Sequence, residues 1–407
     1  MSTPAKRILL LAPQPFFAAR GTPLNVREIL TTLSGNGYQV DCLVYPFGQD
    51  LQIENVSILR SSNLPFIRSV PIGPSIAKIF LDLPFLLKAL WLGLTRRYDA
   101  FHGIEEAGFF AGILGLLCRK PYIFDVDSSM HDQLETSGFI SSKMILKAFT
   151  AVETFFIKRS TAVVTVCQAL SDEVKRIAPS ANVHQIEDFP LDGEAGDPGV
   201  PDPVDLRRVH NVPSDRAMLL YLGNFEPYQG IDLFLEAYAD YIQSRIRKDL
   251  KVNSHLMLVG GGEARLAATK AHAEKLGLAE LVTFAGPVPP ETSAAVLRQA
   301  DVLISPRLAG TNTPLKIYSY MQAGKPIIAT DIYSHTQVLD GRSAILSTPD
   351  RSGLQAAITA VLDESDEAQE HSLQLGRAAK ELVETRYSRE IFRDGFTKLY
   401  RAVLVNG

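Results

Sequence analysis

Residues 305–330 indicate the fold most clearly and read SPRLAGTNTPLKIYSYMQAGKPIIAT. An apolar run over residues 302–304 precedes them, and a polar loop rich in Gly, Asn and Thr follows that run. Pro314 stands where a helix tolerates proline, so we expect a helix over residues 315–322 and a strand over residues 327–329. A strand, a helix and a second strand in this order predict parallel strands joined by a crossover helix.

The same alternation extends outward from this unit through two blocks of the chain. Apolar segments of strand length predict strands over residues 8–12, 40–44, 100–102, 122–125 and 162–166, then 218–222, 256–259, 282–284, 302–304 and 327–329. Helical spacing of apolar residues fills the intervals and recurs at the end of the chain near Phe392. Between the blocks, residues 193–213 contain Pro198, Pro201 and Pro203 and show no periodicity, which is typical of a linker.

This pattern predicts an α/β protein with two Rossmann-like, doubly wound domains that face a cleft. The expected boundaries are residues 1–190 for the N-terminal domain, 191–213 for the linker, 214–385 for the C-terminal domain and 386–407 for a C-terminal helix. In such folds, ligands bind at the carboxyl ends of the strands.

The composition narrows the classes of function. The chain has 407 residues, with 41 Lys and Arg against 45 Asp and Glu, for a net charge of −4. This balance argues against a nucleic-acid-binding protein, because such proteins carry strongly basic surfaces. Cys42, Cys118 and Cys167 are widely spaced and odd in number, which predicts a reduced, cytoplasmic protein. The first apolar run is too short for the core of a signal peptide.

The longest apolar region of the sequence runs from Ile79 to Leu94. It includes charged residues and falls short of the ~20 apolar residues that a membrane span needs. Its leucines fit helical spacing, so we expect either a buried helix or a helix on a membrane surface. In the second case the segment from Ile79 to Arg97 would give a peripheral contact at the inner face of the membrane, with Lys88, Arg96 and Arg97 near lipid headgroups.

Glycine-rich turns follow several expected strands, at Gly21, Gly223 and residues 260–262. Such turns let a phosphate or a sugar approach the backbone beside the positive end of a helix, although they also serve plain tight connections. Lys316 is expected in the first turn of its helix, where a cation opposes the helix dipole. A bound anion would remove this conflict, so Lys316 is either a phosphate ligand or a solvated surface lysine.

Five segments carry a resemblance to a known family. They read GYQV at 37–40, YLGNF at 221–225, LVGGGE at 258–263, VTFAG at 282–286 and AGKPIIAT at 323–330. In this order and spacing, over nearly the whole chain, the sequence resembles the family 4 glycosyltransferases.

The resemblance implies the GT-B fold and a retaining, hexosyl-type transferase. The second domain would hold a nucleotide-sugar donor, and the first a glycan, a lipid-linked or a small-molecule acceptor. The C-terminal helix would cross back to the first domain. No metal and no cofactor are expected, since cations and helix N-termini stabilise the leaving diphosphate. The donor's own phosphate would take the acceptor proton.

The candidate site residues divide between the two domains. In the first domain the expected catalytic residues are Asp127, His102 and Glu105, and the expected acceptor-side loop contains Gly21 and Thr22. In the second, the expected donor-binding residues are Gly223, Asn224, Gln229, Gly262, Arg307, Thr313, Leu315, Lys316 and Ser319. Asp125-Val126-Asp127 also matches the metal-binding Asp-x-Asp of another glycosyltransferase fold, a weaker alternative than Asp127 facing sugar or acceptor hydroxyls.

Several positions depart from the family pattern. Asn224 stands where an arginine is usual, Gln229 where a lysine is usual, and Thr311 and Ser319 where two glutamates are usual. Losing a charged hydrogen bond at Ser319 would cost about 1.5–3 kcal/mol without compensation. Two hypotheses follow: an active enzyme in which Arg307 and Lys316 carry the phosphate charge, or a non-catalytic nucleotide- or sugar-binding protein. The intact entry from Thr313 through Lys316 favours the enzyme.

Overall fold

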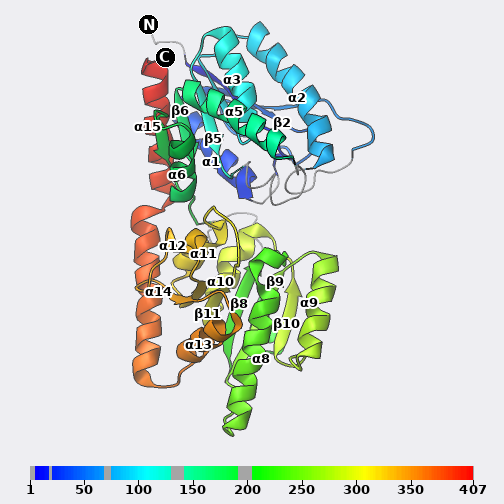
Figure 1. Ribbon diagram of the computed structural model, residues 1–407, viewed down its shortest axis with the longest axis vertical. Helices are drawn as coiled ribbons and strands as arrows, with labels where there is room; N and C mark the ends of the chain where they lie inside the picture. The colour runs from blue at the N-terminus through cyan, green and yellow to red at the C-terminus, as the bar shows by residue number, and fades with distance from the viewer. Residues whose placement is uncertain (1–4, 18–20, 68–74, 130–141, 191–203, 407) are drawn as a thin grey trace. The chain divides into compact units, whose positions relative to one another are not determined.

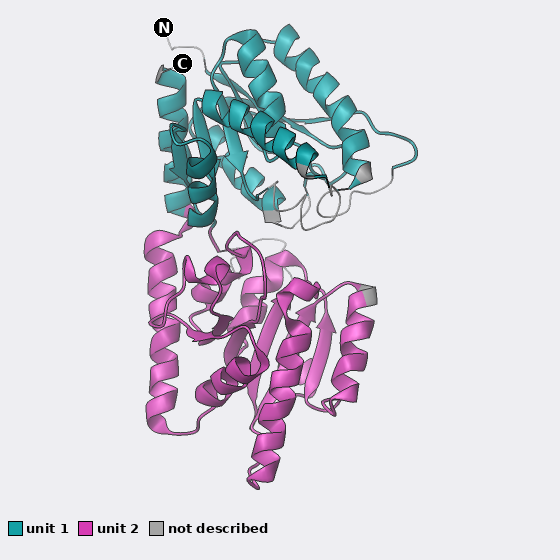
Figure 2. Cartoon of the chain, viewed as in Figure 1, with its two compact units in different colours: residues 1–188, 390–407 teal, residues 189–389 magenta. Residues whose placement is uncertain are grey.

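The computed structural model describes residues 5–17, 21–67, 75–129, 142–190 and 204–406. The chain divides into two compact units (Figure 2), formed by residues 1–188 with 390–407 and by residues 189–389. Unit 1 and unit 2 are used below for these two sets. Most of the predicted linker, residues 191–203, lies outside the described residues.

Unit 1 is built on a parallel sheet of seven strands in the order β3-β2-β1-β4-β5-β6-β7 (Figure 1). The strands are β1 (Arg7–Ala12), β2 (Gln39–Val44), β3 (Val56–Arg60), β4 (Ala100–Ile104), β5 (Tyr122–Val126), β6 (Ala162–Thr165) and β7 (Val183–Gln185). Its helices are α1 (Gly21–Gly35), α2 (Ile76–Thr95), α3 (Ala107–Cys118), α5 (Lys143–Arg159), α6 (Gln168–Ile177) and α15 (Arg389–Asn406). Residues 8–12 of β1 are fully buried, because helices cover both faces of the sheet. Neither face is open to solvent, so apolar and polar residues do not alternate along the strand.

Unit 2 repeats this design with six parallel strands in the order β10-β9-β8-β11-β12-β13. The strands are β8 (Ala217–Gly223), β9 (Ser254–Gly260), β10 (Val282–Gly286), β11 (Val302–Ser305), β12 (Ile327–Thr330) and β13 (Ile345–Ser347). Its helices are α7 (Leu206–Val209), α8 (Ile231–Arg247), α9 (Glu263–Lys275), α10 (Ser293–Arg298), α11 (Leu315–Ala323), α12 (Tyr333–Thr336), α13 (Arg351–Val361) and α14 (Asp366–Arg386), with 3-10 turns η1 (Pro227–Gln229) and η2 (Pro290–Thr292).

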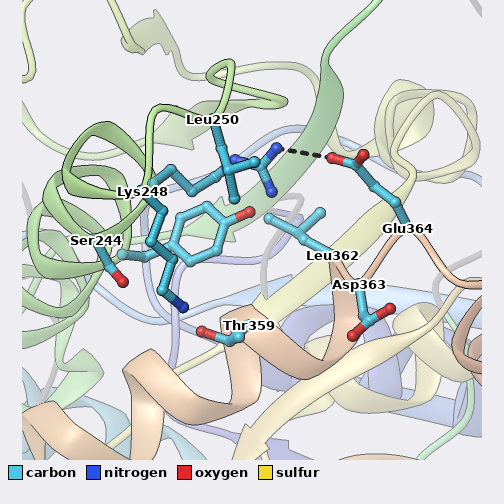
Figure 3. Close-up of a pocket in the computed structure, with 9 residues that line it drawn as sticks. Ser244, Lys248, Leu250, Thr359, Leu362, Asp363 and Glu364 are labelled. Atoms are coloured by element: carbon cyan, nitrogen blue, oxygen red, sulfur yellow. Dashed lines mark hydrogen bonds and ion pairs between the residues drawn. The ribbon is translucent and has the colours of Figure 1, made fainter.

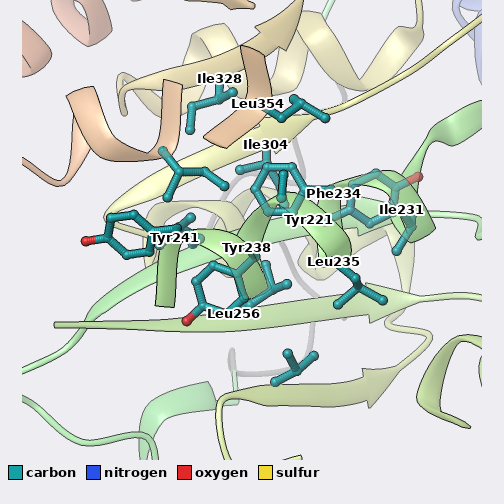
Figure 4. Packing of buried hydrophobic residues seen from close by; sticks show 14 of the residues in the cluster. Tyr221, Ile231, Phe234, Leu235, Tyr238, Tyr241, Leu256, Ile304, Ile328 and Leu354 are labelled. Atoms are coloured by element: carbon teal, nitrogen blue, oxygen red, sulfur yellow. The ribbon is translucent and has the colours of Figure 1, made fainter. Parts of the chain in front are cut away.

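The apolar side of α8 packs against one face of the unit 2 sheet (Figure 4). Phe234 and Tyr238 lie one helical turn apart and pack with Leu256 of β9 and Ile304 of β11 in a single apolar cluster. Burying an aromatic side chain of this size contributes on the order of 2–3 kcal/mol. This packing holds the strand ends in place, and the loops that leave those ends build the site.

Both sheets have the doubly wound topology predicted from the sequence. In each, the order reverses at one point, between β1 and β4 in unit 1 and between β8 and β11 in unit 2. Ligands of such sheets bind outside the carboxyl ends of the strands at this reversal. The prediction missed three sheet-edge strands, β3, β7 and β13, which are short and carry partly exposed residues, so they lack long apolar runs.

The final helix, α15, belongs to unit 1 although it follows unit 2 in the chain. The Tyr400 hydroxyl lies 2.6 Å from His102 Nδ1, and Phe396 stacks on the His102 ring. Arg393 Nε donates to Glu28 Oε1 of α1 at 2.5 Å. Helix α15 therefore completes the core of unit 1.

Candidate active site

The carboxyl edge of the unit 2 sheet gathers the predicted donor-binding residues. Gly223 ends β8, and Ser305 ends β11 just before the loop that leads to α11. The carboxyl ends of these parallel strands lie at one edge, next to the reversal of strand order. An added Cβ at Gly223 would lie 3.5 Å from Lys316 Nζ, so the first turn of α11 returns to the end of β8.

Lys316 occupies a partly buried position with no carboxylate partner among the described residues. Its Nζ donates to Gln229 Oε1 at 2.7 Å and lies 4.1 Å from the centre of the Tyr221 ring. Burial and the nearby Arg307 guanidinium hold the pKa of this amine well below that of an ordinary lysine. The site is therefore a place where positive charge is costly until an anion arrives.

Arg307 supplies the second cation and is 7% exposed. Its Nε donates to the Ala309 carbonyl at 2.6 Å and its Nη1 to the Asn312 carbonyl at 3.1 Å, both in its own loop. Its backbone is fixed as well, since the Thr330 hydroxyl donates to the Arg307 carbonyl. The guanidinium thus braces the loop over residues 306–313 while adding charge beside Lys316.

The pKa of His335 indicates that the electrostatic potential in this region is positive. Its Nδ1 donates to the Thr330 carbonyl at 2.9 Å, and its Nε2 lies 3.0 Å from the Ser305 hydroxyl. Burial, together with the charges of Lys316 and Arg307, lowers the pKa of His335 to about 4. A neutral imidazole therefore ties the end of β11 to the end of β12 beneath a positively charged site.

The other predicted donor residues lie around Lys316 and Arg307 and differ in their exposure to solvent. Asn224 and Gly262 are exposed, and Leu315 is partly buried at the start of α11. Ser319 is 7% exposed, and Thr313 is 3% exposed with no hydrogen-bond partner for its hydroxyl among the residues described. Together with Gly223, Gln229, Arg307 and Lys316, these nine residues lie at strand ends, in the segments that follow them or in the first two turns of α11, at this one edge.

Replacing Gly310 by alanine is expected to disturb the arginine specifically. Gly310 has φ +119°, and an added Cβ would overlap the Arg307 guanidinium. We expect the free energy of unfolding in urea to fall by about 1–2 kcal/mol. An alanine with a left-handed backbone and a displaced Arg307 side chain would both destabilise the folded state. Gly341→Ala is the control, because its Cβ meets nothing within 4 Å. Equal stability of the two variants would show that the Arg307 position is not fixed by this loop.

Unit 1 has a candidate site of opposite charge at its own carboxyl edge. Glu105 follows β4, Asp127 follows β5, and Asp188 lies beyond β7. Burial first, and then neighbouring carboxylates, raise the pKa of Asp127 well above its ordinary range and raise that of Glu105. Thr22 opposes this rise by hydrogen bonding to Asp127, which links the predicted acceptor-side loop to this edge. A carboxyl with a raised pKa keeps its proton to higher pH than a solvated one, and in the protonated form it can both donate and accept hydrogen bonds.

His102 lies beneath this edge and not on it. It is fully buried in β4, with Nε2 3.0 Å from Asp125 Oδ2 and Nδ1 2.6 Å from the Tyr400 hydroxyl. Both ring nitrogens are engaged, which favours a positioning role over the direct catalytic role expected from the sequence. Asp125 points to the same histidine, and the described part of the chain shows no group of three or more side chains arranged to hold a metal ion.

Asp188 was not singled out by the sequence, because it lies in an aperiodic stretch. Asn25 Nδ2 donates to Asp188 Oδ1 at 2.5 Å, yet burial raises the pKa of this carboxyl to about 7. The folded state therefore holds a proton that the unfolded state releases near pH 4, so folding stability falls as pH rises from about 4 to about 7.

This shift predicts that Asp188→Asn stabilises the protein at high pH alone. At pH 8 we expect a free energy of unfolding higher by on the order of 2–4 kcal/mol, because the variant has no charge to bury. At pH 4 the two proteins should be nearly equal, which serves as the internal control. Urea denaturation at both pH values measures this, and a variant that is less stable at pH 8 would contradict it.

A further pocket of about 280 Å³ lies in unit 2 between the end of α8 and the end of α13 (Figure 3). Tyr241, Lys248 and Thr359 line it, and an ion pair of 2.8 Å between Arg245 and Glu364 borders it. Helices of this topology return to the amino ends of the strands, so the pocket is at the edge opposite Lys316. It contains none of the predicted site residues.

Comparison with known proteins agrees with this arrangement. The model of the family described as "Glycosyltransferase Family 4" matches residues 20–187, and that described as "Glycosyl transferases group 1" matches residues 216–364. The sequence is 27% identical over 408 residues to the phosphatidyl-myo-inositol mannosyltransferase of Mycobacterium leprae, with 98% of each chain covered.

Solved structures share the fold. Sucrose-phosphate synthase from Thermosynechococcus elongatus superposes with a TM-score of 0.75 at 20% identity, covering 99% of this chain and 100% of that one. Anabaena HepE in complex with UDP-glucose gives a TM-score of 0.69 at 15% identity, covering 97% and 99%. The predicted GT-B fold is confirmed, and the chain belongs to the family 4, or group 1, glycosyltransferases.

Proposed function

We propose that this glycosyltransferase moves a hexose, with retention at the anomeric carbon, from a nucleotide-sugar donor to a glycan or lipid-linked acceptor. Unit 2 would hold the donor at Lys316 and Arg307, and unit 1 the acceptor at Asp127 and Glu105. The observation that carries the proposal is the Lys316 amine, held without a carboxylate partner among the described residues beside a second cation.

The argument for a diphosphate rests on charge. A buried amine without a counterion destabilises the free protein, and an anion that pairs with it restores the lost interaction. A nucleoside diphosphate develops its negative charge as the sugar leaves, so two fixed cations stabilise the leaving group more than the bound donor. Lys316 and Arg307 would supply this charge without a metal ion.

The acceptor edge would orient hydroxyls rather than remove a proton. Burial and neighbouring carboxylates raise the pKa values of Asp127 and Glu105, so each keeps a proton to higher pH than a solvated carboxyl and can exchange hydrogen bonds with acceptor hydroxyls. The acceptor proton would pass to the donor's phosphate. Asp125 and His102 would hold this edge from below through their 3.0 Å contact.

The relatives support the substrate classes of the proposal. One is named for mannosyl transfer to a phosphatidylinositol, and one solved structure contains UDP-glucose. Both relatives are consistent with a nucleoside diphosphate hexose as donor and with an acceptor hydroxyl group on a larger molecule.

A second candidate is a nucleotide- or sugar-binding protein without transfer. It is favoured by uncharged side chains at Asn224 and Ser319, where charged partners of the donor are usual in the family. Gln229 also stands where the family usually has a lysine, but it has a role in this site. Its side-chain oxygen accepts a hydrogen bond from Lys316 and so helps to position that amine.

Calorimetric titration with UDP, GDP and ADP in metal-free buffer separates the two. We expect micromolar binding of one nucleotide, and then release of that nucleotide when its sugar is supplied with lipid or glycan acceptors. Proton NMR of the product would show a retained anomeric configuration. Binding without any turnover would favour the second candidate, and no binding by folded protein would contradict both.

A further inference from the structure

The solvent-facing side of α2 is apolar along its whole length. Its exposed stripe contains Ile79, Phe80, Leu83, Leu87, Trp91 and Leu94, which are between 52% and 62% exposed. These residues recur every three or four positions and so share one face. The opposite face carries Leu81, Phe85, Ala89 and Leu92, all fully buried in unit 1. Water-soluble helices normally expose polar residues on the outer face, so this stripe needs an explanation.

The stripe continues onto neighbouring helices. Gly93 of α2 lets Leu114 of α3 approach closely, and Gly112 of α3 does the same for Phe156 of α5. The three helices therefore pack side by side in one layer (Figure 1). Exposed apolar side chains extend along it at Leu116, Leu117, Met144, Ile145, Val152 and Phe155. Phe66 adds to the α2 end by packing edge-on against Phe80, with 6.0 Å between ring centres.

The charges on this layer have one sign. Each exposed charged residue described in α2, α3, α5 and the residues just after them is basic, namely Arg97, Arg119, Lys120, Lys147, Lys158 and Arg159. The acidic Asp82 is only partly exposed, with its Oδ1 accepting from Tyr45 at 2.6 Å, and Glu153 is 6% exposed. This basic surface occurs on a chain whose net charge is −4.

We propose that the layer formed by α2, α3 and α5 docks on an anionic lipid bilayer, with α2 lying in the plane of the interface. Apolar side chains with a basic surround match acyl chains beneath anionic headgroups. Trp91 fits the interfacial zone, where its ring is buried and its N–H stays hydrated. No helix among the described ranges is long and apolar enough to cross a membrane, so the contact is peripheral.

Trp91 makes the test direct, because it is the single tryptophan of the chain and is 56% exposed. With vesicles of phosphatidylglycerol and phosphatidylcholine, we expect its emission to move to shorter wavelength and to be quenched by brominated acyl chains. Flotation should carry the full-length protein with the same vesicles, and salt should weaken the association. Neither measurement needs a donor or an acceptor, so the result is independent of the proposed function.

Matched variants locate the contact. Leu83→Ser, Leu87→Ser and Leu94→Ser combined should weaken vesicle binding by about tenfold or more, since three apolar side chains no longer enter the bilayer. Ile246→Ser and Leu373→Ser combined are the control, because these residues are 54% and 48% exposed on helices of unit 2. Circular dichroism and thermal unfolding would show that both variants fold.

Three results would overturn the proposal. The first is an unchanged Trp91 spectrum and no flotation with anionic vesicles. The second is equal binding to pure phosphatidylcholine, which would remove the role of the basic residues. The third is a dimer, detected by sedimentation, that the leucine variant dissociates and that does not bind vesicles. That dimer would mean that a second copy of the chain covers this layer.

Discussion

Lys316→Met is expected to raise the thermal stability of the free protein and to weaken its binding of nucleoside diphosphates. The native amine has a pKa well below that of a free lysine, so the unfolded chain binds the proton more tightly than the folded one. The resulting penalty is largest below the folded-state pKa of the amine and shrinks as pH rises toward the ordinary lysine value. Methionine keeps an unbranched apolar stem and removes the penalty.

Binding should change in the opposite direction. A lost charge-assisted hydrogen bond is worth about 1.5–3 kcal/mol, or roughly 10- to 100-fold in the dissociation constant of the nucleotide. Turnover should fall further, because the leaving diphosphate carries more charge in the transition state. Calorimetry and differential scanning calorimetry measure the two effects on one sample.

The matched control is Lys275→Met, since Lys275 is exposed in the last turn of α9. Neither nucleotide affinity nor thermal stability should change there by more than experimental error. A Lys316→Met protein that is less stable than the native one, yet binds nucleotide normally, would make the lysine a structural residue and remove the phosphate assignment.

Asp127→Ala and Asp127→Asn are expected to behave very differently. If the carboxyl acts as a neutral hydrogen-bonding group, asparagine preserves its shape and most of its contacts. We expect kcat/KM for the acceptor to fall less than about tenfold in Asp127→Asn and about 100-fold in Asp127→Ala. Donor affinity should stay unchanged in both, because the donor is proposed to bind unit 2.

A general base would give another pattern. Removing the basic oxygen by either substitution would then cost the same large factor, and the pH dependence of kcat would lose its acidic limb. Glu54→Ala is the control for surface charge in unit 1, because Glu54 is exposed and precedes β3, at the amino end of that strand and not at its carboxyl end. Steady-state kinetics with saturating donor, over a range of pH, distinguishes the two roles.

The sequence was sufficient for the fold because local patterns determine it. Apolar runs of strand length alternate with helical spacing, and this alternation can only form parallel sheets with crossover helices. The placement of residues 305–330 at a carboxyl edge was also predictable, since they join a strand end to a helix start.

Environment and distant partners could not be predicted in the same way. Helical spacing could not tell whether Lys316 is solvated or packed against Tyr221, because Tyr221 lies on a strand 95 positions earlier in the chain. His102 depends on Tyr400, which is separated from it by 298 positions in the chain. The α2 segment is mostly apolar, so its pattern alone favours a buried helix and leaves a surface helix as the alternative, and only the structure shows the exposed stripe.

The return of α15 to unit 1 has a consequence for synthesis of the protein. The residues that cover His102 and pair with Glu28 are synthesised after all of unit 2. Residues 1–188 therefore lack part of the unit 1 core until α15 has been synthesised, which takes place after residues 189–389. A nascent chain stalled before Arg389 should hold a protease-sensitive unit 1 beside a folded unit 2. The domain made first would thus be the last to mature.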